Sequence, residues 1–126
     1  MTNSKVTILI VEDNALNLEL VTDLLELANF RVVATKNGEE SLELATKEQP
    51  KLILMDISLP GIDGLEASRR LKKGDATSTI PVLALTAHSM KGDMERAHDA
   101  GCCGYFTKPI NTRTFVESLQ PFLEQV

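Results

Sequence analysis

The sequence has few aromatic residues, with no tryptophan, one tyrosine and four phenylalanines among its 126 residues. Proteins that bind single-stranded nucleic acid stack bases on aromatic side chains, so this composition disfavours that function. Basic residues are also in the minority, 13 against 18 acidic ones, which gives a net charge of −5. This charge argues against binding to a phosphate backbone or to an anionic membrane surface, so we expect neither nucleic acid nor membrane as a partner.

Cysteine is nearly absent, and the two cysteines present, Cys102 and Cys103, are adjacent. They cannot join distant segments by a disulfide, and they lack the spacing of a zinc site. The sequence also lacks a signal peptide and any apolar run near the ~20 residues that a membrane span needs. These absences predict a cytoplasmic protein of one domain, residues 1–126, whose fold depends on its hydrophobic core.

Short apolar runs alternate with helical patterns along the whole chain. The apolar runs predict strands at residues 6–11, 30–35, 51–55, 81–85 and 104–107, and the 3.6-residue period predicts helices at 14–28, 39–47, 65–72, 89–100 and 112–124. In the first helix, leucines recur three or four residues apart, and we interpret this stripe as the face that packs on the core; its members are Leu16, Leu20, Leu24 and Leu27. Five successive β-then-α units predict an α/β fold, a doubly wound parallel sheet with helices on both faces.

Chemically reactive side chains follow four of the predicted strands. Glu12 and Asp13 follow the first strand, Asp56 the third, Thr86 the fourth and Lys108 the fifth. In open parallel sheets, ligands bind outside the carboxyl ends of the strands, where the strand order reverses. We therefore expect three carboxylates, a hydroxyl and a lysine to meet at one edge of the sheet.

Three carboxylates held close together repel one another unless a cation is present. Mg²⁺ suits such a site because it prefers oxygen ligands and is typically held by one or two carboxylates together with phosphate oxygens. With Lys108 and Thr86 nearby, the set is typical of phosphoryl transfer, with a carboxylate as the nucleophile. A single aspartate at a strand end more often caps the next helix, so the interpretation depends on the whole combination.

Five short motifs are spread over nearly the whole chain: Ile10-Val-Glu-Asp-Asn14, Leu54-Met-Asp-Ile57, Leu59-Pro-Gly-Ile-Asp-Gly64, Ala84-Leu-Thr-Ala87 and Lys108-Pro109. In sequence and in order they resemble the motifs of the CheY-like response-regulator receiver family of bacterial two-component signalling. Within the family, the segments 12–14 and 90–93 are most similar to DivK-type single-domain regulators and to the receiver domains of hybrid histidine kinases. The resemblance implies a flavodoxin-like, five-stranded sheet of order 2-1-3-4-5.

The resemblance also implies roles for individual residues. Asp56 would accept a phosphoryl group from the phosphohistidine of a histidine kinase or histidine phosphotransfer protein. Mg²⁺, or Mn²⁺ in its place, would be held by Asp13, Asp56 and the backbone carbonyl of Ser58, with Glu12 contributing through water. Lys108 would contact the phosphoryl group.

Further residues match the family's switch and its variable positions. Thr86 would move toward the phosphoryl group and Tyr105 would turn into the vacated space, remodelling a protein-binding face on the fourth helix, the last strand and the last helix. The bond between Lys108 and Pro109 is expected to be cis. Ser58 and His88 are expected to set the lifetime of the phosphoryl group. A half-buried Tyr105 that does not switch and an exposed loop His88 are the simpler alternatives.

We therefore expect a receiver domain without an output domain, a signalling switch that catalyses its own phosphorylation and slow dephosphorylation and acts on a downstream protein. A monomer or weak dimer is expected. A receiver segment of a hybrid histidine kinase is one alternative, although the Met1 start argues against it. A metal-dependent phosphohydrolase is another, and it is disfavoured because no second acid follows Asp56 closely and no insertion is long enough for a cap. A receiver-like protein that binds partners without phosphorylation is the third.

Overall fold

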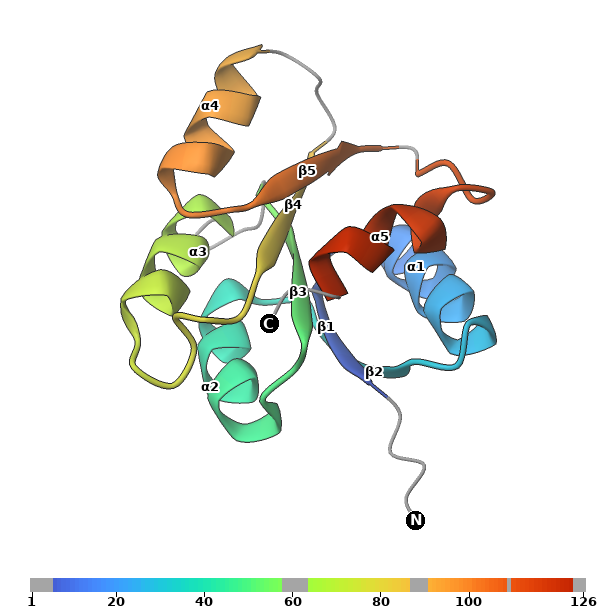
Figure 1. The fold of residues 1–126 in the computed structure, drawn as a ribbon, viewed down its shortest axis with the longest axis horizontal. Helices are drawn as coiled ribbons and strands as arrows, with labels where there is room; N and C mark the ends of the chain where they lie inside the picture. The colour runs from blue at the N-terminus through green and yellow to red at the C-terminus, as the bar shows by residue number, and fades with distance from the viewer. Residues whose placement is uncertain (1–5, 58–63, 87–90, 109, 124–126) are drawn as a thin grey trace.

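The computed structural model describes residues 6–57, 64–86, 91–108 and 110–123. In this part of the chain, strands and helices alternate strictly (Figure 1). The strands are β1 (Thr7–Val11), β2 (Arg31–Thr35), β3 (Leu52–Asp56), β4 (Val82–Thr86) and β5 (Gly104–Thr107). The helices are α1 (Ala15–Leu27), α2 (Gly38–Glu48), α3 (Gly64–Lys73), α4 (Lys91–Asp99) and α5 (Phe115–Leu123). Each predicted element is therefore confirmed, with small shifts at its ends.

The largest shift is at α5, which begins at Phe115 rather than at residue 112. The side chain of Asn111 accepts a hydrogen bond of 3.0 Å from the backbone N–H of Arg113, and this local turn takes the place of the first predicted helical turn. Pro121 lies inside α5, and the helix continues past it to Leu123.

The five strands form one parallel sheet in the order β2-β1-β3-β4-β5, which confirms the predicted fold class. The chain passes from β1 outward to β2 and then returns to place β3 on the other side of β1, so the order reverses between β1 and β3. Val11 is paired with Met55 across this boundary. The next residues along the two strands, Glu12 and Asp56, therefore lie at the same level of the sheet.

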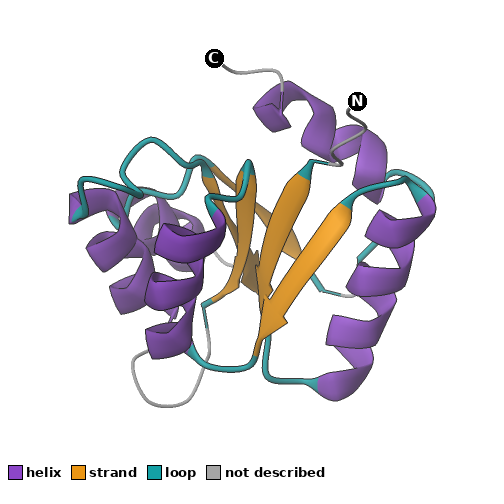
Figure 2. Cartoon of the chain, turned by 90° about the horizontal axis from the view of Figure 1, so that it is seen from below, coloured by secondary structure: helices purple, strands orange, loops and turns teal. Residues whose placement is uncertain are grey.

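Helices cover both faces of the sheet (Figures 1 and 2). On one face, strand residues such as Leu9 and Met55 pack with residues of α2, α3 and α4. On the other, Ile10 and Leu54 pack with α1 and α5. The strands are apolar on both sides because both sides are buried, as expected for a parallel sheet. No helix in the described ranges is long and apolar enough to cross a membrane.

The predicted core face of α1 is wrong. Val21 and Leu25 are the buried residues of this helix, whereas Leu16 is 78% exposed and Leu27 is 86% exposed. Leucines lie on more than one side of α1, and Leu18 and Leu24 pack partly against the buried cluster. The hydrophobic period therefore predicts the helix but does not identify which side faces the sheet.

Gly64 allows α3 to begin directly against the end of β3. A Cβ atom at this position would lie 2.1 Å from the backbone oxygen of Asp56 and 2.5 Å from the Cα of Ile57. Both neighbours are backbone atoms, which cannot rotate away. Gly64 thus keeps the start of α3 close to Asp56, the central residue of the predicted site.

We predict that Gly64→Ala lowers the free energy of unfolding by about 2 kcal/mol, because it forces the backbone of α3 away from β3. Gly92→Ala is the matched control, since a Cβ at Gly92 in α4 meets no atom within 4 Å. The control is expected to stabilise the protein by roughly 0.5–1 kcal/mol, since alanine is the better helix former. Urea unfolding of both variants measures the two effects, and an equally stable Gly64→Ala variant would show that the close approach is not required.

Candidate functional site

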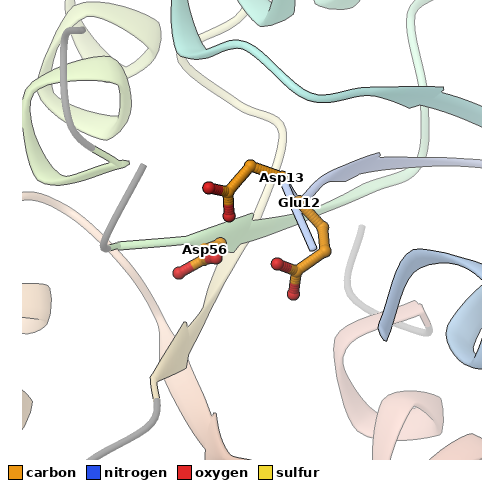
Figure 3. Close-up of side chains that lie close together, drawn as sticks. All are labelled: Glu12, Asp13 and Asp56. Atoms are coloured by element: carbon orange, nitrogen blue, oxygen red, sulfur yellow. The ribbon is translucent and has the colours of Figure 1, made fainter. Parts of the chain in front are cut away.

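Three acidic side chains meet at the carboxyl ends of β1 and β3. Glu12 and Asp13 directly follow β1, and Asp56 is the last residue of β3. One carboxylate oxygen from each of the three lies within 4.8 Å of the others. Figure 3 shows the three side chains close together at the ends of these strands. The prediction that these residues come together is confirmed.

Burial differs among the three residues. Glu12 and Asp56 are each 1% exposed, whereas Asp13 is exposed at the rim. A carboxylate loses hydration when it is buried, so it needs hydrogen-bond donors or a cation to remain charged. The site therefore combines two buried acidic groups with an opening toward solvent at Asp13.

Backbone hydrogen bonds hold the segment that carries Glu12. Its N–H donates to the carbonyl of Thr35 at the end of β2, at 3.0 Å, and its Oε2 accepts from the N–H of Asn14 at 3.1 Å. The Asn14 side chain in turn caps α1 by accepting from the N–H of Asn17 at 3.0 Å. These contributions of Thr35 and Asn14 were missed by sequence reasoning, although an asparagine just before a helix is a recognisable capping signal.

Lys108 supplies the positive charge at the site. Its Nζ forms an ion pair of 2.7 Å with Oε1 of Glu12 and donates a hydrogen bond of 3.0 Å to Oδ2 of Asp56. The backbone N–H of Lys108 donates to the carbonyl of Thr86 at 2.7 Å, which extends the pairing of β4 with β5. One ammonium group thus bridges two of the three carboxylates.

The pKa values of Glu12 and Lys108 are both raised, but for different reasons. Burial raises the pKa of Glu12, and its hydrogen bond with Asp56 raises that pKa further, against the opposing effects of Lys108 and the Asn14 N–H. Burial alone would lower the pKa of Lys108, but hydrogen bonds and charges from Glu12 and Asp56 outweigh it and raise the pKa. Lys108 therefore keeps its positive charge. The three carboxylates together carry more negative charge than this one ammonium neutralises.

Thr86 and Tyr105 lie on neighbouring strands close to this edge. Thr86 ends β4 and is buried, and Tyr105 is half-buried on β5 opposite Ala84. Tyr105 packs against the cluster on the α4 side of the sheet. It also lines a pocket of about 180 Å³, together with Met94, Ala97, His98, Cys102, Cys103 and Gly104.

Some of the predicted positions lie outside the residues that the structure describes. These are Ser58, His88 and Pro109, so the predicted Ser58 carbonyl ligand, the lifetime role of Ser58 and His88 and the cis bond before Pro109 stay predictions. Cys102 is buried and Cys103 is exposed, and both are free thiols.

The arrangement suits a hard divalent cation next to a nucleophilic carboxylate. Oxygen ligands from carboxylates are what Mg²⁺ prefers in proteins, and the exposed Asp13 leaves room for water ligands. A bound cation would also remove the repulsion that Lys108 offsets only in part.

The sequence matches a family model described as the response regulator receiver domain over residues 8–120. It is 46% identical to the polar-differentiation response regulator DivK of Brucella anthropi over 117 residues, covering 93% of this chain and 95% of that protein. The DivK of Brucella ovis is 44% identical over the same length and with the same coverage.

Solved structures show the same similarity. A putative response regulator from Chloroflexus aurantiacus has a TM-score of 0.92 and 30% identity, covering 96% of this chain and 99% of that one. The receiver domain of a Pseudomonas aeruginosa sensor histidine kinase has a TM-score of 0.89, with the same identity and coverage. That structure holds a magnesium ion coordinated in its active-site cleft.

We predict that Lys108→Met lowers the free energy of unfolding by about 2 kcal/mol at pH 7, because two buried carboxylates lose their cation. The loss should shrink as the pH falls toward 4.5, since Glu12 has a raised pKa and is protonated early, after which it no longer needs the lysine. Lys108 stays protonated over this range because its own pKa is raised. Urea unfolding between pH 7 and pH 4.5 measures the difference.

The matched control for this experiment is Lys73→Met, which removes an exposed lysine at the end of α3. We expect it to change the free energy of unfolding by less than about 0.5 kcal/mol at any of these pH values. A loss for Lys108→Met that does not depend on pH would mean that the lysine acts through packing rather than through charge.

Proposed function

The chain belongs to the response regulator receiver domain family of two-component signalling, and we propose that it receives a phosphoryl group on Asp56 from a phosphohistidine. The donor is a partner histidine kinase or histidine phosphotransfer protein. One observation carries the proposal: the Asp56 carboxylate lies at the switch point of the sheet, beside two other carboxylates and in hydrogen-bond contact with Lys108.

In the proposed reaction, a carboxylate oxygen of Asp56 attacks phosphorus while the bond from phosphorus to the imidazole nitrogen breaks. The departing imidazole takes up a proton from solvent and leaves as histidine. Phosphoryl transfer requires positioning and charge neutralisation more than covalent chemistry from the protein. Lys108 provides a fixed positive charge 3.0 Å from Oδ2 of Asp56, and the pairing of β3 with β1 and β4 fixes the position of the Asp56 backbone at the end of the strand.

Mg²⁺ fits this site as a cofactor because the donor set consists of carboxylate oxygens within 4.8 Å of one another. Asp13 and Asp56 would hold it directly, with the Ser58 carbonyl, and Glu12 would contribute through water. When bound, the ion supplies positive charge for the transferring phosphoryl oxygens. The magnesium ion in the similar Pseudomonas receiver domain supports the assignment.

The phosphoryl group then biases a two-state switch in this proposal. Its oxygens need donors, and the hydroxyl of Thr86 and the ammonium of Lys108 are the proposed donors at this edge of the sheet. Tyr105 lines a pocket of about 180 Å³ together with residues of α4, so a movement of this side chain would alter the surface next to α4. The face formed by α4, β5 and α5 would change with it and bind a downstream protein, because a local change of charge selects one of two packings.

We place this activity in the cytoplasm, where both free thiols would stay reduced. The proposed role is that of a switch, with catalysis limited to its own phosphorylation and slow dephosphorylation. A phosphohydrolase would instead turn over a small phosphate ester many times. That turnover is the result that would favour the alternative enzyme.

Incubation with acetyl phosphate and Mg²⁺ tests the proposal. We expect intact mass spectrometry to show one phosphoryl group per chain, no label when Mg²⁺ is chelated, and none on Asp56→Asn, which lacks the nucleophile. Asp13→Asn should be labelled roughly tenfold more slowly or worse, since it removes a charge that holds the cation. Asp75→Asn, an exposed aspartate after α3, is the matched control and should behave as wild type.

Two results would contradict the proposal. An unlabelled wild-type protein would favour a receiver-like protein that acts without phosphorylation, and equal labelling of Asp56→Asn would place the modification elsewhere. Phosphotransfer assays with each histidine kinase and phosphotransfer protein of the source organism then identify the donor of the phosphoryl group.

A further inference from the structure

A short turn connects α4 to β5 (Figure 1) and carries the exposed thiol of Cys103. Gly101 in this turn has a φ of 98°, and its N–H donates to the carbonyl of His98 at 2.9 Å. The N–H of Cys102 donates to the carbonyl of Ala97 at 3.0 Å, so this pair of hydrogen bonds closes the end of α4. The N–H of Cys103 then donates to a carbonyl of β4 at 2.9 Å. Hydrogen bonds on both sides therefore fix the backbone of Cys103 relative to α4.

The two adjacent thiols have different surroundings. Cys102 is 4% exposed, and its Sγ donates a weak hydrogen bond of 3.6 Å to the Oγ of Ser68 in α3. Cys103 is exposed, and its Sγ lies 3.6 Å from the carbonyl oxygen of Val82. The Cys102 thiol is thus engaged in the core, and Cys103 is the thiol that is available to a ligand.

Two further side chains that can bind a soft metal lie near Cys103. Met94 and His98 are four residues apart on α4 and so lie on one side of the helix. Met94 is 40% exposed, and the exposed His98 side chain forms no hydrogen bond or ion pair within the described ranges. Both residues line the pocket of about 180 Å³ that Cys103 also lines. A thiol, an imidazole and a thioether from two parts of the chain therefore share one pocket.

A second pocket, of about 340 Å³, places negative charge next to the first. It shares Met94 and His98 with the first pocket and is otherwise lined by Glu95 and Asp99. Both carboxylates are exposed, so water and salt weaken their effect, but its sign favours a cation.

Lys72 of α3 is a positive group that acts on Cys103. Burial raises the pKa of the Cys103 thiol, and the charge of Lys72 opposes this effect only in part. The Lys72 ammonium donates to the carbonyls of Ser78 and Ile80, and Lys72 lines neither pocket. Lys72 therefore does not occupy the space beside the three donor groups, and the Cys103 thiol keeps its proton until a metal displaces it.

The donor set selects the metal. Thiolate and thioether sulfur are soft ligands that favour Cu⁺, and imidazole nitrogen also binds copper. A structural zinc site needs a full tetrahedral set of ligands such as cysteine and histidine. Among the described residues, the group of three or more His, Cys, Asp or Glu side chains close enough to hold a metal is the acidic cluster at Asp56. The pocket therefore offers too few such ligands for zinc, and it suits Cu⁺, which accepts fewer ligands and binds thioether sulfur.

We propose that this pocket binds one Cu⁺ ion through the Sγ of Cys103, a ring nitrogen of His98 and the Sδ of Met94. As the sulfur of Cys103 binds the ion, its proton leaves to solvent. The bound ion would join α4 to the start of β5, at the opposite end of the strands from Asp56. The site goes beyond the proposed function and does not depend on it, because none of its ligands belongs to the phosphorylation site.

Competition with the chromogenic chelator bicinchoninate, without oxygen and with ascorbate as the reductant, measures binding of Cu⁺ to the full chain. We expect one Cu⁺ per chain. Cys103→Ser should weaken binding by more than about a hundredfold, because losing the anionic ligand costs more than losing an outer-shell partner. Met94→Leu and His98→Asn should each weaken binding roughly tenfold.

Cys102→Ser is the matched control and should bind Cu⁺ as wild type does, because the Cys102 thiol lies in the core against Ser68. Asp56→Asn should also bind Cu⁺ as wild type does, which separates the copper site from the proposed phosphorylation. X-ray absorption at the copper edge should show both sulfur and nitrogen ligands in the wild-type complex. This measurement needs no variant, so it remains informative if a substitution disturbs the fold.

Three results would overturn the copper site. Wild-type affinity in both Met94→Leu and His98→Asn would mean that Cys103 binds copper as an isolated thiol. A loss in Cys102→Ser as large as that in Cys103→Ser would place the ion in the core instead of the pocket. One Cu⁺ per two chains would assign the ion to the thiols of two copies.

Discussion

The structure depends on a balance of charge at one edge of its sheet. Parallel pairing of β1 with β3 brings Glu12, Asp13 and Asp56 to the same level, and the ammonium of Lys108 contacts two of them, Glu12 and Asp56. Burial makes the repulsion between these carboxylates stronger than it would be in water. The edge is therefore stable enough to fold, yet it retains an excess of negative charge that a cation would relieve.

This imbalance links the fold to the proposed chemistry. A site that Lys108 fully neutralised would have little affinity for a divalent ion, and a site without Lys108 would be costly to bury. Lys108 is held by the same β4–β5 pairing that positions Thr86 and Tyr105. A change of charge on Asp56 would therefore act on Lys108, whose backbone extends the pairing of β5 with β4.

The sequence predicted the sheet and the acidic cluster because both follow from short-range rules. Alternation of apolar runs and helical periods specifies a doubly wound sheet, and residues after parallel strands must meet at one edge. The core face of α1 could not be predicted, since leucines occupy several sides of that helix and the choice is made by packing against β1, β2 and α5. The requirement for glycine at position 64 could likewise not be predicted, because the contact with the Asp56 backbone exists only after α3 packs against β3.

The most direct test of the central claim, that this edge binds a divalent cation, is isothermal titration of the protein with MgCl₂ at pH 7. We predict one Mg²⁺ per chain, with affinity strongly reduced in Asp13→Asn, which removes a carboxylate at the rim without disturbing the contacts of Lys108. Absence of Mg²⁺ binding to wild type, or equal binding by Asp13→Asn, would contradict the claim.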